Sequence, residues 1–141
     1  MLRDQLSILR FGSTYSEIKT DSKAALLYNV IYMLRRLLFS LLAVVLDGSP
    51  VLQVQLLIFH CILMLMYNIL VQPFEEPTLN HLEIFNELCI ICAAYHLIPF
   101  TDFLDDPNVQ YEIGWSIIGI TTFNIAANML FMSVLSLRKL W

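Results

Sequence analysis

Charged residues are scarce in this sequence. Only 14% of its 141 residues are Asp, Glu, Lys or Arg, and 58% are hydrophobic, whereas soluble domains have about 25% charged and about 45–50% apolar residues. Glycine occurs only four times and proline five times, which leaves little material for loops. Because disorder requires low hydrophobicity and high charge, the composition excludes disorder for most of the chain and argues against a soluble enzyme.

The sequence also lacks a basic excess. It has 8 Lys and Arg against 12 Asp and Glu, a formal charge of -4, so it offers no basic face to phosphates and we expect no nucleic-acid partner. Residues 1–23 lack the apolar stretch of a cleavable signal peptide. Any membrane-insertion signal is therefore expected in an internal hydrophobic segment.

Motifs for catalysis or cofactor binding are missing as well. The sequence contains no Walker A motif, GxGxxG, GxSxG or HExxH, so we predict no enzyme and no cofactor. Cys89, Cys92 and His96 share one helix face, with His60 and Cys61 at a similar depth. A CxxC spacing in an apolar helix is more often two small hydrophobic residues than a metal site, and we predict no metal.

Long uncharged runs are present instead. Residues 51–71 form a run of 21 and residues 113–137 a run of 25 without a formal charge, each long enough to cross a hydrocarbon core of about 30 Å. Residues 82–100 are apolar apart from a few polar and ionisable groups, which predicts a third span.

The first hydrophobic region, residues 24–46, is interrupted by Arg35 and Arg36, which leave ten uncharged residues at 37–46. Two interpretations remain open. Residues 24–33 could form an interfacial amphipathic helix before a short span, or one helix could cross the bilayer with its arginines paired to acids elsewhere. We favour the crossing helix.

The placement of basic residues predicts the topology. Lys and Arg occur before residue 37 and then only at Arg138 and Lys139, so the positive-inside rule places both termini on the inner side and requires an even number of crossings. Four spans satisfy that rule. We therefore expect an all-α integral membrane protein with a basic N-terminal segment, residues 1–23, and a four-helix membrane domain, residues 24–141.

Four ionisable residues are expected to meet inside the membrane. Glu83 and Glu87 lie four residues apart, on one face of the third span, and Arg35 and Arg36 approach the same depth from the first span. Since an unpaired charge there would cost at least about 2.5–3.5 kcal/mol, an ion-pair network between the two helices is expected. Its simplest role is to fix the packing of the helices; participation in an ion or proton path is the alternative.

Uncharged polar residues form stripes on the other spans. Such stripes should face neighbouring helices, where each hydrogen bond is worth about 0.6–2 kcal/mol, or else line a hydrated path. The third span adds Asn86 to this set. The polar residues concerned are Gln53, His60 and Tyr67 at a spacing of seven, with Asn68 beside them, on the second span and Thr121, Asn124 and Asn128 on the fourth.

The loop between the third and fourth spans carries Asp102, Asp105 and Asp106. It lacks the alternating oxygen ligands and the glycine of an EF-hand, so we favour a solvated loop. The alternative is an outer loop that attracts cations to a pore mouth.

Several short motifs resemble the C-terminal membrane region of TRP-like (transient receptor potential-like) multi-pass proteins of the ciliate type, over most of the chain from Phe11 onward. They are Tyr28-Asn29, Met33-Leu34-Arg35-Arg36-Leu37, Gln72-Pro73-Phe74, Asn80 with Glu83-Ile84-Phe85-Asn86-Glu87, Thr101-Asp102-Phe103 and Ile113-Gly114-Trp115-Ser116.

The resemblance implies a channel-like or transporter-like module for cations, with the bilayer, further membrane subunits or further copies of itself, and a cation as partners. Members of that family usually carry more helices and a large extracellular region before the part matched here, so we expect an incomplete pore. No selectivity motif of the family has a counterpart in this sequence. The alternative function is a non-transporting accessory subunit of a larger complex, such as a respiratory complex.

Overall fold

The computed structural model describes residues 18–19, 23–101 and 106–140, with the side chains of 139 and 140 excepted. The elements are α2 (Lys23–Leu26), α3 (Tyr28–Val45), α4 (Pro50–Val71), α5 (Pro77–Tyr95), the short 3-10 helix η1 (Ile98–Phe100) and α6 (Pro107–Leu140). Within these residues the only extended pairing is an isolated bridge between Ile18 and Phe74. The prediction of an all-α chain is confirmed.

Proline sets the start of three of the long helices. Pro50, Pro77 and Pro107 each stand at the beginning of a helix, where the missing N–H costs nothing because the first-turn donors have no partner within the helix. The third and fourth helices therefore begin before the predicted spans at 82 and 113. Hydrophobicity marked only the apolar part of each helix and missed its polar first turns.

The first predicted span, residues 24–46, differs in the structure. A single turn, α2, is separated at Leu27 from α3, which runs unbroken for 18 residues through Arg35 and Arg36. The third predicted span, residues 82–100, is also divided. α5 ends at Tyr95 and η1, with Pro99 inside it, follows, because proline cannot continue an α-helix.

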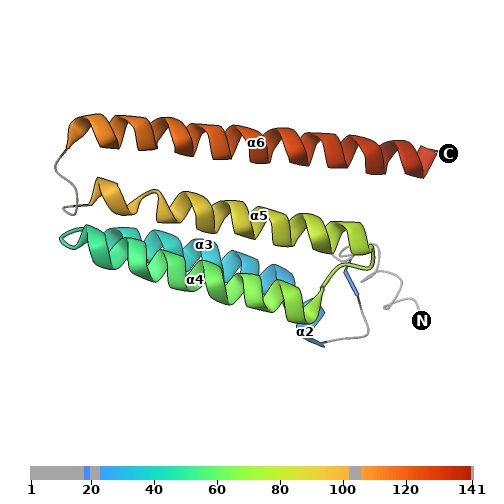
Figure 1. Cartoon of the computed structure of the whole chain (residues 1–141). Coiled ribbons are helices and arrows are strands. Elements are labelled where there is room, and N and C mark those ends of the chain that lie inside the picture. Colours follow the sequence, from blue (N-terminus) through green and yellow to red (C-terminus); the bar gives the residue numbers. More distant parts are fainter. Residues whose placement is uncertain (1–17, 20–22, 102–105, 141) are drawn as a thin grey trace.

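The four long helices run antiparallel in chain order (Figure 1). α5 lies between the α3–α4 pair and α6, and α6 packs mainly against α5. The beginning of α3 and the end of α6 lie at the same end of the bundle, here called the α4–α5 end because α4 and α5 are connected there. Which side of a membrane this end faces stays a prediction.

All four helices are long and apolar enough to cross a membrane: Tyr28–Val45, Pro50–Val71, Pro77–Phe100 and Pro107–Arg138. Only 6% of the first span and none of the fourth is buried inside the protein, so large apolar side chains cover the outside of the bundle. Such a surface matches lipid or other helices and is far larger than soluble proteins expose. The predicted four-span membrane protein is thus confirmed.

A small cluster closes the α4–α5 end. Ile18, Ala25 and Tyr28 are buried there against Tyr67 and Phe74, among others. The backbone N–H of Lys19 donates to the carbonyl of Pro73 at 2.9 Å, so the last part of the predicted basic segment is tied to the α4–α5 connection. Residues 1–17 and 20–22 of that segment lie outside the described residues.

Asn80 stabilises the α4–α5 connection with both polar atoms of its side-chain amide. Its Nδ2 donates to the carbonyl of Phe74 and its Oδ1 accepts from the N–H of Phe74, both at 2.9 Å, and the residue is 5% exposed.

Asn80→Ala should lower the free energy of unfolding by about 1–3 kcal/mol, because two backbone groups lose their partners. Titration of the detergent-solubilised protein with SDS, followed by circular dichroism, measures this. The exposed neighbour His81 is the control, and equal losses for Asn80→Ala and His81→Ala would contradict the expectation.

Candidate functional site

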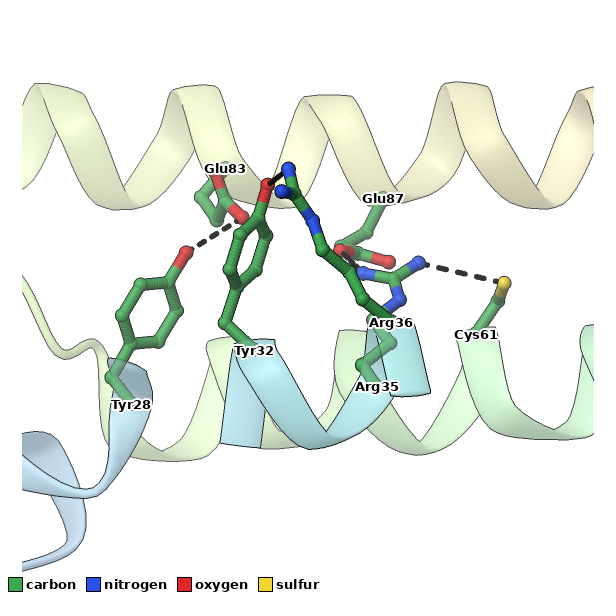
Figure 2. A network of polar contacts seen from close by, with 7 residues as sticks. All are labelled: Tyr28, Tyr32, Arg35, Arg36, Cys61, Glu83 and Glu87. Carbon is green, nitrogen blue, oxygen red and sulfur yellow. Dashed lines mark hydrogen bonds and ion pairs between the residues drawn. The ribbon is translucent and has the colours of Figure 1, made fainter. Parts of the chain in front are cut away.

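An ion pair joins α3 to α5 in the interior of the bundle (Figure 2). Nη1 of Arg35 donates to Oε1 of Glu87, and the Glu87 side chain is only 1% exposed. Nη2 of Arg35 lies 3.6 Å from Sγ of Cys61 on α4. Arg35 therefore contacts two other helices, and pairing offsets the cost of about 2.5–3.5 kcal/mol that either charge alone would carry at this depth.

Arg36 and Glu83 do not join this pair, so the expected four-residue network is divided. Nη2 of Arg36 donates to the Tyr32 hydroxyl at 2.6 Å, and its guanidinium carbon lies 4.6 Å from the Tyr32 ring centroid. Glu83 Oε1 instead accepts from the Tyr28 hydroxyl at 2.8 Å (Figure 2). Successive residues of a helix point about 100° apart, so only one of two adjacent arginines can face α5.

Sequence reasoning missed the two tyrosines of this site. Tyr28, Tyr32 and Arg36 follow one another at a spacing of four on α3, and the two rings stack with centroids 6.3 Å apart. This i, i+4 spacing is the signal that could have identified them.

Three asparagines connect α5 to α6. Asn86 Oδ1 accepts from Nδ2 of Asn124 at 2.9 Å and from Nδ2 of Asn128 at 2.6 Å, and Asn86 Nδ2 donates to Asn128 Oδ1 at 3.1 Å. The structure therefore brings Asn86, Asn124 and Asn128 together. Thr121 does not take part, since its hydroxyl donates to the Ile117 carbonyl of its own helix at 2.8 Å.

The residues of the predicted stripe on α4 lie in different environments. Nε2 of Gln53 donates to the carbonyl of Ala43, near the end of α3, at 3.1 Å. His60 Nε2 is buried and has no hydrogen-bond partner within the described part of the chain. Asn68 is 1% exposed, and neither polar atom of its side chain is paired there. The polar residues of α4 therefore do not form one continuous contact with a single neighbouring helix.

The remaining candidates lie near the α5–α6 connection. His96 Nδ1 lies 2.7 Å from the carbonyl of Cys92, and Nε2 lies 3.2 Å from the hydroxyl of Ser116 on α6. The residues that the structure describes include no group of three His, Cys, Asp or Glu that could hold a metal ion. Asp106 accepts from the N–H of Asn108 at 2.9 Å, whereas Asp102 and Asp105 lie outside the described residues.

Two hollows flank α5. The apolar groove has a volume of about 630 Å³, and its wall is mostly apolar apart from Tyr32, Arg35, Arg36, Ser40 and His60. The polar cleft has a volume of about 430 Å³ and lies between α3, α5 and α6. Its lining residues are Tyr32, Arg35, Glu83, Asn86, Glu87, Ile90, Asn124, Ile125, Asn128 and Met129.

The fold and these sites define an all-helical, multi-pass membrane protein with polar groups enclosed between its helices. Comparison of the chain with models of protein families, with curated proteins and with solved structures gave no match.

Proposed function

We propose that the chain is a channel-like or transporter-like membrane module for cations and that the polar cleft is its cation site. The observation that carries the proposal is the position of Glu83 in that cleft, beside three asparagine side chains. Intramembrane carboxylates are costly, and they commonly mark ion or proton pathways. The resemblance to the C-terminal membrane region of TRP-like proteins agrees with this function.

The charges in the cleft favour a cation over an anion. The pairing of Arg35 with Glu87 balances one positive and one negative charge. Among the described residues Glu83 contacts the Tyr28 hydroxyl, and no basic side chain is within ion-pair distance of it. A carboxylate without a counter-charge in a medium of low dielectric constant attracts cations strongly. The side chains of Asn86, Asn124 and Asn128 are hydrogen-bonded to one another and add uncharged polar groups to the lining of the same cleft.

The module is proposed to work in an oligomer or with other membrane subunits. Helices α3, α5 and α6 line the cleft, but α6 packs mainly against α5, so the cleft is open between α3 and α6. Closure into a continuous path requires helices from another chain. The proposal includes the lipid bilayer and a cation as partners, and it includes no enzymatic reaction, cofactor or nucleic acid.

Neutralising Glu83 tests the proposed site. Glu83→Gln keeps the size of the side chain and its capacity to accept from Tyr28, but it removes the charge, so we expect cation flux to fall by about tenfold, equivalent to about 1.4 kcal/mol. Flux is measured in proteoliposomes with a potassium-sensitive and a sodium-sensitive dye, and the native size of the assembly is measured in parallel. Glu76→Gln, an exposed residue at the start of α5, is the matched control.

A non-transporting accessory subunit is the second candidate function. The observation in its favour is that no residue of the fourth span is buried inside the protein, which leaves an extended apolar helix for packing against a larger complex. In that case Glu83→Gln and wild type give the same background flux, and loss of abundance or of assembly is the phenotype instead. That outcome would reject the cation module.

A further inference from the structure

Arg36 is an exposed cation at the middle of a membrane-spanning helix. It is the ninth of the 18 residues of α3, and Tyr32 supplies both the hydrogen bond and the cation–π contact of its side chain. No carboxylate of the described chain lies within ion-pair distance of it. Its neighbour Arg35, in contrast, is paired with Glu87. One of the two central arginines is therefore paired with a carboxylate, and the other is exposed without one.

Arg36 lies on the wall of the apolar groove, to which all four long helices contribute. The groove is lined by Phe39, Leu57, Ile90 and Ile117, among others, and has a volume of about 630 Å³. His60 lines it too, and Nε2 of His60 has no hydrogen-bond partner within the described chain. The groove thus combines an apolar wall with a cation that has no carboxylate partner in the described part of the chain.

The depth of Arg36 determines which anion can reach it. Halfway along α3 is about 13 Å from either end of the helix, which is farther than an arginine side chain extends. Lipid headgroups remain at the interface, so an acidic side chain at the same depth in a neighbouring helix is better placed to supply the counter-charge. Within this chain Glu87 is paired with Arg35, and Glu83 lines the polar cleft and not the apolar groove; a second copy of the chain carries both carboxylates in these same places.

We propose that the apolar groove is the docking site for a transmembrane helix of a different polypeptide, and that this helix presents an Asp or Glu to Arg36. The apolar side chains of the groove pack against that helix, and the ion pair fixes its depth and rotation. The interaction requires the four-span fold and does not depend on cation transport.

Synthetic transmembrane peptides test the proposal directly. The full chain, labelled with a fluorescent donor, is reconstituted in phosphatidylcholine vesicles with an acceptor-labelled leucine–alanine peptide that carries one glutamate at its centre. The matched peptide carries glutamine instead. We expect the glutamate peptide to associate about tenfold more strongly than the glutamine peptide. Arg36→Met should abolish this preference, whereas Leu41→Met, on an exposed part of α3 outside both hollows, should retain it.

A second variant keeps the test valid if Arg36→Met does not insert. Ala93→Phe fills the groove without changing any charge, so it should weaken binding of the glutamate peptide as well. Equal association of the two peptides with the wild-type chain overturns the proposal. Energy transfer between copies of the chain that disappears in Arg36→Met also overturns it, because a second copy is then the occupant. Arg36-dependent transfer to a labelled anionic lipid, without a preference between the peptides, overturns it in favour of lipid.

Discussion

Arg35→Met is expected to lower the free energy of unfolding by about 3–5 kcal/mol, because it leaves the carboxylate of Glu87 buried without its counter-charge. Glu87 is 1% exposed, and its Oε2 already lacks a partner within the described chain. Removing the guanidinium also removes the hydrogen bond to Oε1, so both carboxylate oxygens of Glu87 would then be without this partner. The measurement is reversible SDS unfolding of the detergent-solubilised protein, followed by circular dichroism.

The double variant Arg35→Met/Glu87→Met separates the ion pair from packing. Replacing both charges of a buried pair by apolar side chains is often neutral or stabilising, so the double variant should recover most of the stability lost in Arg35→Met. Arg36→Met is the matched control on the adjacent position, and we expect it to cost much less because Arg36 is exposed and pairs with no carboxylate of the described chain. If the double variant is no more stable than Arg35→Met, the unpaired charge of Glu87 is not the cause of the stability lost in Arg35→Met.

Asn86→Leu is expected to release α6 from α5. Asn86 takes part in three hydrogen bonds to Asn124 and Asn128, and with hydrogen bonds between membrane helices averaging about 0.6 kcal/mol each, their loss should weaken the contact by about 2 kcal/mol. Because α6 packs mainly against α5, contacts with α3 and α4 would do little to compensate for the loss.

Disulfide formation between α5 and α6 measures this release. Phe85 on α5 and Phe123 on α6 are in edge-to-face contact, with ring centroids 6.0 Å apart, so a Phe85→Cys/Phe123→Cys pair reports whether the helices are docked. Asn86→Leu in that background should reduce the equilibrium extent of disulfide formation. Thr121→Val should not, because the Thr121 hydroxyl bonds only to its own helix. Unchanged disulfide formation in Asn86→Leu would mean that apolar packing alone holds α6.

Helix content and the number of spans could be predicted from the sequence because they depend on local properties. A run of about 20 apolar residues is long enough to cross the hydrocarbon core as a helix. The ends of the helices were less predictable, since the residues after Pro77 and Pro107 are mostly polar and add little hydropathy. The helix-starting position of proline was the signal available there, and it places the beginnings of α4, α5 and α6.

The polar contacts were less predictable than the helices. The spacing of Asn124 and Asn128 indicated a face turned toward another helix, but Asn86 could be identified as their partner only from the packing of α5 against α6. The same spacing argument grouped Gln53, His60 and Tyr67, with Asn68 beside them, and the structure places these side chains in separate environments. Spacing along one helix determines which residues share a face, but not which neighbour covers that face.

By itself the sequence determined an all-α protein with four membrane-spanning helices, because hydrophobic length and scarcity of charge leave a chain few other ways to satisfy its backbone in lipid. Only the tertiary structure decided which arginine is paired. Arg35 and Arg36 are chemically identical neighbours, and the rotation of α3 against α5 directs Arg35 to Glu87 and Arg36 to the apolar groove. The rotation of α3 results from the packing of all the helices together, so no local sequence pattern predicts it.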